Sequence, residues 1–355
     1  MKNKLRNGIA LSLVPQIIFV LWLGSRPHLV ETYYSKGLYP IISEFFRTLF
    51  GWIPFSIGEI IYTLLLLMAI RYLIKKRREI RTRPLYFLRN VVMVLSVFYF
   101  TFNLVWGLNY YRKPIAEHFA IRDSIQSKEI IDLTEKLILK TNQVQFRITG
   151  DSTQMVKVPY DRSEIFNKTI NGYEQLQGQL PFLEYDRPSL KKSMFSTLAS
   201  YMGIGGYLNP FTNEAQVNAK TPVFRFPVVS GHEVGHQVGY SKENETNFIG
   251  YLVTMKNKDI YFQYSAYAYA LSHCLRAIHA TDESKSEELY KKINLGTQKN
   301  YQELRDFQKK YENPLEPIFK SVFHTFLKAN QQKDGIKSYS KIVALLVGYH
   351  ERYPI

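Results

Sequence analysis

The chain has 355 residues, of which 46% are hydrophobic and 21% charged, and this composition excludes a disordered or fibrous protein. The net charge is +16, but residues 1–112 carry +11 of it and the longer remainder only +5. Because that remainder shows no basic stripe with interleaved aromatic residues, we expect no nucleic-acid partner. The single cysteine, Cys274, excludes a disulfide framework and a cysteine-rich metal site.

Three apolar stretches in the first third of the chain predict transmembrane helices, at about residues 7–25, 53–73 and 90–111. The first contains 19 uncharged residues and the third 22, and about 20 residues are needed to cross the hydrocarbon core of a bilayer. The second stretch reaches that length only if it includes Glu59. A signal peptide would account for the first stretch but not for the other two. We therefore expect residues 1–112 to form a membrane domain in contact with the lipid bilayer.

Basic residues predict the orientation of these helices. Lys2, Lys4 and Arg6 precede the first stretch, and six lysines and arginines lie at 75–83, between the second and the third. Positively charged loops remain on the cytoplasmic side of a membrane. With three crossings, residues 113–355 then lie outside. The sequence predicts a multi-pass protein of the cytoplasmic membrane with an extracytoplasmic C-terminal domain.

From residue 113 onward the apolar residues mostly recur at helical spacing, as at 128–141. The stretch 203–223 differs, because it is rich in glycine, proline and asparagine and contains the strand candidate EAQVN. We expect a helix-dominated α+β domain, so that the whole chain is mainly α. Ala215–Asn218 is predicted to be an edge strand that holds an extended substrate, with Gln216 and Asn218 as substrate-binding residues. The alternative is a sheet edge without that role.

Residues 230–240 read SGHEVGHQVGY and contain the motif H-E-x-x-H. On a helix, His232 and His236 are one turn apart on the same face, so that both imidazoles can reach one cation about 2 Å away. Glu233 lies beside the open coordination position, where it can act as general base and then as general acid. Zinc (Zn²⁺) is the expected ion. The alternative is a capping box, in which Ser230 begins the helix and Glu233 caps it without a metal.

A catalytic zinc site needs a third protein ligand, and two acidic residues follow the motif. In an unbroken helix Glu243 would lie about 10 Å along the axis from His236, too far for a shared ion. Gly239 permits a left-handed helix end after which the chain turns back. Ser241 can then cap the next helix and place Glu243 in its first turn. We favour Glu243 over Glu245 as the third ligand, the alternative being a carboxylate that only stabilises the helix end.

One turn after Glu243, Asn247 would lie on the same helix face. Its side chain could hydrogen-bond a metal ligand from the second layer of the site.

The run HEVGHQVGYSKE resembles the metzincin pattern, except that Lys242 stands where that family has its third ligand. The run ENETN is similar to the E-x-x-A-D/N signature of gluzincin membrane peptidases, whose first glutamate binds zinc. Over nearly the whole chain the sequence more closely resembles an uncharacterised family of bacterial multi-pass membrane proteins with a zincin-like domain. The matching segments are 106–112, 207–218, 232–237 and 243–252. This resemblance implies a multi-pass membrane protein with a metallopeptidase domain, and it implies no particular substrate.

The leading hypothesis is a membrane-anchored, zinc-dependent metallopeptidase that hydrolyses a peptide or protein substrate, with Glu233 as general base. The alternative is a non-catalytic membrane scaffold or sensor with a structural or vestigial metal site. The two hypotheses differ in whether a fourth coordination position stays open for water. The sequence leaves the substrate and the oligomeric state open.

Overall fold

The computed structural model describes residues 2–122, 125–329 and 341–355. Its contacts divide the chain into two compact units. The first consists of residues 1–113 together with 209–214, and the second of residues 114–208 and 215–355. The described residues are mostly helical with few strands, which confirms the prediction of a mainly α protein. The assignment of 209–214 to the first unit is not anticipated by the sequence.

The first unit contains three helical segments that are long and apolar enough to cross a membrane. Helices α1 (Lys2–Leu11) and α2 (Leu13–Gly24) supply the first, Asn3–Gly24, and helices α5 (Ile57–Thr82) and α6 (Pro84–Val105) supply the others. The third segment ends earlier than predicted because a 3-10 helix occupies Gly107–Tyr111. These three segments indicate a membrane-associated protein.

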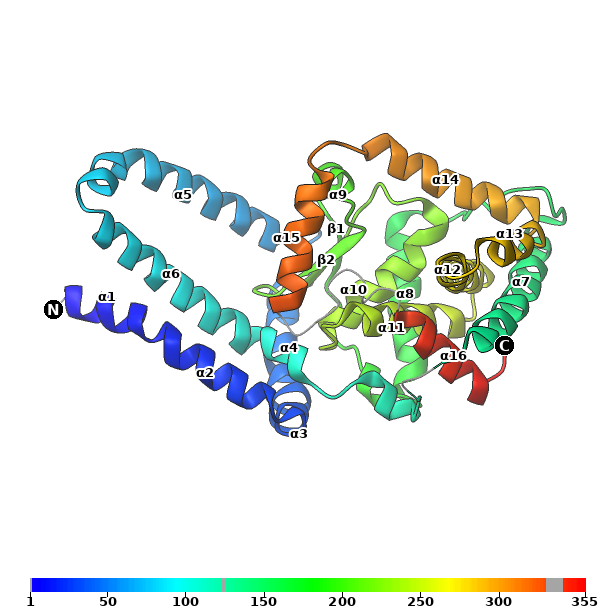
Figure 1. Ribbon diagram of the computed structural model, residues 1–355, viewed down its shortest axis with the longest axis horizontal. Coiled ribbons are helices and arrows are strands. Elements are labelled where there is room, and N and C mark those ends of the chain that lie inside the picture. Colours follow the sequence, from blue (N-terminus) through cyan, green and yellow to red (C-terminus); the bar gives the residue numbers. More distant parts are fainter. Residues whose placement is uncertain (1, 123–124, 330–340) are drawn as a thin grey trace. The chain divides into compact units, whose positions relative to one another are not determined.

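Helices α5 and α6 form an antiparallel hairpin, and α1 and α2 run along α6 (Figure 1). A small polar cluster joins the first and third apolar segments. The hydroxyls of Ser12 and Ser96 lie 3.1 Å apart, and the Gln16 side-chain amide donates to Ser96 at 3.0 Å. Polar contacts of this kind hold apolar helices together inside a bilayer, where burial of apolar surface provides no driving force.

Between the first two apolar segments the chain forms α3 (Pro27–Leu29), a π-helical segment (Val30–Leu38) and α4 (Tyr39–Phe50). The π-helical segment packs against the carboxyl end of the third apolar segment. The Arg112 guanidinium forms a buried ion pair with Glu31, with Nη2 2.9 Å from Oε1. The Ser35 hydroxyl donates to the Asn109 side chain at 2.8 Å. The carboxyl ends of α2 and α6 therefore lie at the same end of this unit.

Residues 209–214 complete the first unit by capping α5. The carboxylate of Glu214 accepts hydrogen bonds from the backbone N–H groups of Ile57 at 3.1 Å and Gly58 at 2.6 Å. The Thr212 hydroxyl donates to the same carboxylate at 2.8 Å. A carboxylate at this position satisfies helix N–H groups that have no partner within the helix.

The second unit consists of ten helices and a small sheet among the described residues. Its helices are α7 (Ser127–Thr149), α8 (Arg162–Gln177), α9 (Ser196–Tyr201), α10 (Phe226–Gln237), α11 (Glu243–Lys256), α12 (Ile260–His279), α13 (Glu283–Lys291), α14 (Leu295–Tyr311), α15 (Glu316–Ala329) and α16 (Ile342–Arg352). Short 3-10 helices lie at Ile115–Phe119, Pro181–Leu183 and Val223–Arg225.

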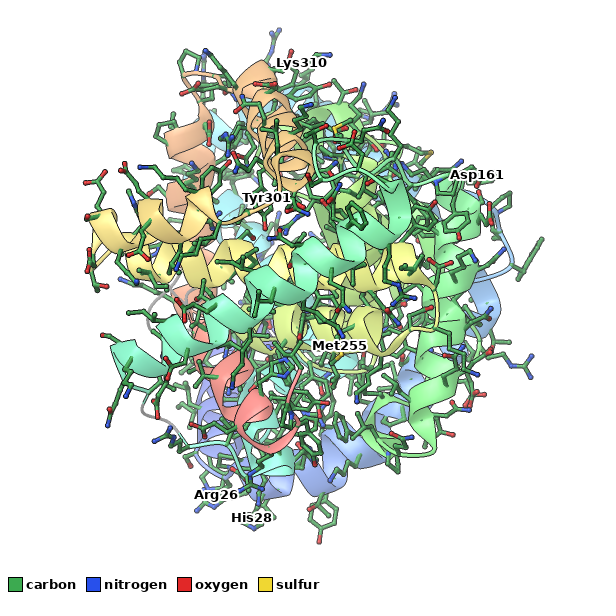
Figure 2. The ribbon with its side chains drawn as sticks, turned by 90° about the vertical axis from the view of Figure 1, so that its right-hand side faces the viewer. Arg26, His28, Asp161, Met255, Tyr301 and Lys310 are labelled. Atoms are coloured by element: carbon green, nitrogen blue, oxygen red, sulfur yellow. The ribbon has the colours of Figure 1, made fainter. Side chains whose placement is uncertain are left out.

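Helix α12 forms the centre of the hydrophobic core of this unit. Tyr264, Ala268 and Leu271 are fully buried on it. Helix α7 packs along α12 and lies in the foreground of Figure 2, while α11 packs against another side of α12. Because α11 contacts both α10 and α12, the core holds the helix of the H-E-x-x-H motif in place through α11.

The sheet has the strand order β1 (Leu190–Lys192), β3 (Glu214–Val217), β2 (Gly206–Asn209). Strand β1 runs parallel to β3, with Leu190 opposite Ala215. The strand predicted from EAQVN is thus confirmed, but the prediction that Ala215–Asn218 lies at the edge is wrong.

Strand β3 is the central strand, so its backbone already pairs with a neighbour on each side. Gln216 and Asn218 are buried, and the Asn218 amide donates to Ser200 and to the Ile204 carbonyl. The substrate-binding role predicted for these two residues assumed an edge strand, and they do not lie on one.

Candidate metal centre

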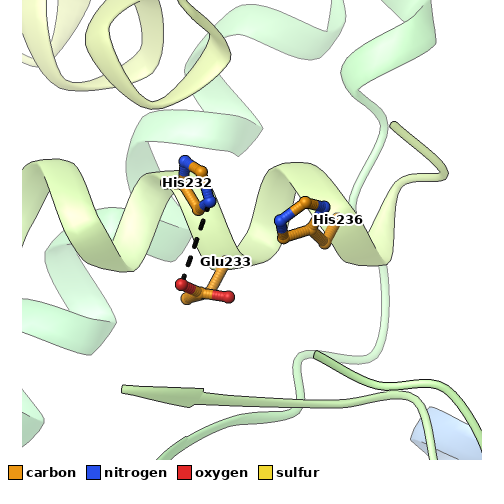
Figure 3. A group of neighbouring side chains, drawn as sticks. All are labelled: His232, Glu233 and His236. Carbon is orange, nitrogen blue, oxygen red and sulfur yellow. Dashed lines mark ion pairs between the residues drawn. The ribbon is translucent and has the colours of Figure 1, made fainter. Parts of the chain in front are cut away.

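Helix α10 carries the H-E-x-x-H motif in its C-terminal half, with His236 in its last turn. Arg225 occupies the N-cap position and Pro227 the first turn, where a missing N–H costs nothing. Ser230 lies more than one turn inside the helix, so it cannot cap the helix start, and the capping-box alternative is excluded. Figure 3 shows His232 and His236 on one side of α10, with Glu233 between them. The Glu233 carboxylate is thereby available to the site.

The chain reverses after α10 as predicted. Gly239 has φ +90°, and its N–H donates to the His236 carbonyl at 3.1 Å, while the Tyr240 N–H donates to the Gly235 carbonyl at 3.2 Å. This is a left-handed helix end of the kind that glycine adopts without strain. Helix α11 then begins at Glu243. The N-cap is Lys242 and not Ser241, whose buried hydroxyl has no hydrogen-bond partner among the described residues, so the predicted cap is wrong.

The reversal brings Glu243 back to the two imidazoles. Its Oε2 lies 3.4 Å from His232 Nε2, and its Oε1 lies 3.8 Å from His236 Nε2. Glu245 is engaged elsewhere, because its Oε1 accepts a hydrogen bond from the backbone N–H of Ile115 at 3.1 Å. Of the two acidic residues that the sequence offers, the structure brings Glu243 to the histidines.

Polar groups of a second layer lie beside both imidazoles. His236 Nδ1 lies 2.8 Å from the Tyr240 carbonyl, so it carries the proton and leaves Nε2 for a ligand bond. Asn247 lies close enough to His232 to help raise the pKa of that imidazole. The Tyr269 hydroxyl donates to Asn247 Oδ1 at 2.6 Å. The His236 ring is thus held by a carbonyl oxygen on the nitrogen that does not face Glu243.

Glu233 is buried close to these rings. Its Oε1 lies 4.0 Å from His232 Nε2, and the carboxyl extends toward a strand of the sheet (Figure 3). A Cβ at Gly206 of β2 would lie 2.5 Å from Glu233 Oε1, so only glycine leaves room for the carboxyl there. The pKa of Glu233 is raised to about 8, chiefly because the carboxyl is buried, while His232 opposes this change and the Glu243 charge adds to it. A carboxyl with a raised pKa is suited to accept and return a proton near neutral pH.

The pKa values of the two histidines are shifted in opposite directions. Burial lowers the pKa of His236 to about 4, although Glu243 opposes this change. Burial also acts to lower the pKa of His232, but the hydrogen bonds to Glu243 and Asn247 and the nearby carboxylates outweigh it and raise that pKa. A metal ion between the rings can bind only if Nε2 of each histidine carries no proton. The ion and a proton therefore compete for each Nε2 atom.

Close packing of α10 on α11 depends on a glycine. A Cβ at Gly250 would lie 2.8 Å from the Val228 carbonyl oxygen and 2.9 Å from the backbone nitrogen of His232. Any larger side chain would separate the two helices. Gly250 therefore allows α11 to approach the backbone of the motif helix and to carry Glu243 and Asn247 to the histidines.

The arrangement fits a zinc ion. The ligand atoms of His232, Glu233 and His236 all lie within 4.8 Å of one another, and Glu243 is closer to both rings than Glu233 is to His232. Ligands about 2 Å from a tetrahedral ion are separated from one another by about 3.3 Å. The distances from Glu243 to the imidazoles are near that value, and two imidazoles with one carboxylate are a donor set that zinc prefers.

Several residues of the site carry no signal in the sequence. Tyr269 is one of 26 tyrosines, and nothing in its neighbourhood marks it. Gly206 belongs to a glycine-rich run that the sequence assigns only to a loop and a strand. Their roles depend on contacts with residues far away along the chain.

A model of the family described as "Protein of unknown function (DUF3810)" matches residues 34–347, which include most of each unit of the chain. No curated protein and no solved structure matches the chain.

Proposed function

The chain belongs to the DUF3810 family of proteins of unknown function, and we propose that it is a membrane-anchored zinc peptidase with a zincin-like domain. The observation that carries the proposal is the position of Glu243. Its carboxylate lies 3.4 Å and 3.8 Å from the Nε2 atoms of His232 and His236. This position supports a three-ligand site beside a buried carboxyl, an arrangement typical of catalytic rather than structural zinc.

In the proposed reaction His232, His236 and Glu243 hold the ion. A zinc ion bound there would polarise the peptide carbonyl and lower the pKa of water. Glu233 takes the proton from the attacking water and returns it to the leaving amine. A pKa of about 8 suits both transfers, because near neutral pH neither the uptake nor the release of the proton is then strongly unfavourable.

The structure suggests which strand would hold the substrate. Gly206 of β2 contacts Glu233, and β2 is an outer strand of the sheet. If an extended peptide paired with the backbone of β2, its scissile bond would lie beside the general base. We propose β2 for the role that the sequence assigned to Ala215–Asn218, and the outer face of the cytoplasmic membrane as the location of the site.

The proposal is tested with two variants of the full-length protein purified in detergent. Glu233→Gln should retain about one zinc per chain and lose roughly 100-fold or more of peptide hydrolysis, because the general base is removed. Glu243→Ala should lose most of the zinc. Glu245→Gln is the matched control, since its side chain can still accept the hydrogen bond from Ile115. Full hydrolysis by Glu233→Gln, or unchanged zinc in Glu243→Ala, would overturn the mechanism.

A structural metal site is the second candidate, favoured by the closeness of Glu233 to the same ion position. If Glu233 were a fourth ligand, no position would remain for water. In that case Glu233→Gln loses zinc, and the native protein cleaves no peptide. The same two measurements therefore distinguish the peptidase from a scaffold or sensor.

A further inference from the structure

Helix α4 of the first unit has its polar side buried and its apolar side exposed. Ser43 and Arg47 are buried, and the Ser43 hydroxyl donates to Asn213 at 2.9 Å. On the opposite side the large apolar side chains recur at helical spacing and continue into the turn after the helix. Their exposed fractions are 67% for Ile41, 62% for Phe45, 48% for Leu49 and 79% for Trp52.

This distribution is the reverse of that on a helix at the surface of a soluble domain. The four exposed side chains surround a shallow hollow of about 430 Å³, whose only other lining residues are Glu44 and Thr48. Exposed apolar patches of this kind mark contact with a membrane or another protein. The lipid-facing candidates in α5, such as Leu65 and Met68, are exposed to a similar degree. Helix α4 thus resembles the apolar helices beside it rather than a water-exposed helix.

The position of α4 in the chain indicates that this helix lies at a membrane boundary. The helix follows the first apolar segment, which ends at Gly24, and precedes the second, which begins at Ile57, so both of its connections lead to a membrane boundary. Its 12 residues extend over about 18 Å, well short of the roughly 30 Å of a hydrocarbon core. A helix of this length cannot cross a bilayer but can lie in its interface.

Contacts within the first unit define the side of the membrane. The Tyr34 hydroxyl donates to the Leu104 carbonyl at 3.0 Å, and Arg112 pairs with Glu31. The segment leading into α4 therefore lies at the end of α6 that is opposite the basic loop 75–83. Since the basic loop faces the cytoplasm, α4 belongs to the outer leaflet.

We propose that α4 is an interfacial membrane helix. Ile41, Phe45, Leu49 and Trp52 contact phospholipid acyl chains in the outer leaflet, while Ser43 and Arg47 face the protein. Trp52 lies at the level of the headgroups, the usual depth of tryptophan in membrane proteins. Through α4 the first unit is held at the surface as well as by its spans. This proposal does not depend on the metal centre.

The test measures the fluorescence of Trp52 in the full-length protein, reconstituted into phosphatidylcholine vesicles with brominated acyl chains. The chain has three tryptophans, so the emission of Trp52 is obtained by subtracting the spectrum of Trp52→Phe from that of the native protein. We expect the Trp52 emission to be blue-shifted and mostly lost when bromine lies near the headgroups. Bromine at the chain ends should quench it less, and aqueous iodide hardly at all.

Two outcomes overturn the proposal. Strong quenching by iodide together with no quenching by brominated lipid would place Trp52 in water. Protection from both quenchers would point to a second copy of the chain, and a Phe45→Cys variant would then form an intermolecular disulfide. The native Cys274 is buried, so it does not compete in that measurement.

Discussion

At the residue scale, the most informative contact is the hydrogen bond from Tyr269 to Asn247. Asn247 helps raise the pKa of His232, and the Tyr269 hydroxyl donates to the Asn247 side-chain oxygen at 2.6 Å. The Arg225 guanidinium lies 4.2 Å from the centre of the Tyr269 ring, where a cation–π contact favours one position of that ring. Tyr269 is therefore a positioning residue, which acts on His232 through Asn247.

Removal of this hydroxyl should weaken metal binding without unfolding the protein. We expect Tyr269→Phe to bind zinc about 10-fold more weakly, because loss of a partner that orients a ligand typically has an effect of that size. Competition with a chromophoric chelator measures this affinity. Tyr267→Phe, on the same helix, is the control and should bind zinc as the native protein does. Equal affinities for both variants would show that Tyr269 only fills space.

At the scale of elements, the site is assembled by the packing of α11 on its neighbours. Helix α10 contributes the histidines, but α11 contributes Glu243 and Asn247, and Gly250 lets the two helices come close. On another side α11 contacts α16 through Tyr251, whose hydroxyl lies 2.6 Å from His350 Nε2. His350 Nδ1 lies 2.8 Å from the Tyr353 carbonyl. Both nitrogens of this buried ring thus have partners in its neutral form.

The neutral state of His350 predicts how stability changes with pH. Burial lowers its pKa from 6.5 to about 4, Lys256 and Lys136 add to the effect, and the Tyr353 carbonyl opposes it. When the pH is below 6.5, the pKa of this histidine in the unfolded chain, the unfolded chain binds a proton that the folded chain does not. The free energy of unfolding therefore decreases as the pH falls from 6.5 toward 4. At about pH 5 the loss of folding free energy from this histidine is about 2 kcal/mol.

Thermal unfolding in detergent measures this loss as the fall in Tm between about pH 7.5 and about pH 5. His350→Gln has no titrating ring but can still hydrogen-bond Tyr251, so its Tm should fall less than that of the native protein. The same fall in both proteins would mean that His350 does not set this dependence.

At the scale of the whole molecule, the basic residues predict the topology. Because positively charged segments remain in the cytoplasm, the charges at the N-terminus and at 75–83 predict, with three spans, that residues 113–355 lie outside. A reporter that fluoresces only in the cytoplasm, fused at the C-terminus, should be dark. The same reporter inserted at Arg83, between α5 and α6, should fluoresce. Fluorescence at the C-terminus would mean an even number of spans or the opposite orientation.

The sequence by itself determined the features that depend on local spacing. Uncharged runs of about 20 residues predicted the apolar helices, the four-residue interval predicted that His232 and His236 share a face, and Gly239 predicted the reversal before Glu243. Each of these follows from the geometry of a single helix or turn, which a short stretch of sequence contains.

Only the tertiary structure decided what depends on distant parts of the chain. It gave β3 a neighbour on each side, engaged Glu245 with Ile115, and brought Glu214 to the start of α5. It also brought Tyr269 to Asn247. A strand's place in a sheet and the partner of a buried side chain are set by packing between segments far apart in sequence, and no local pattern records that packing.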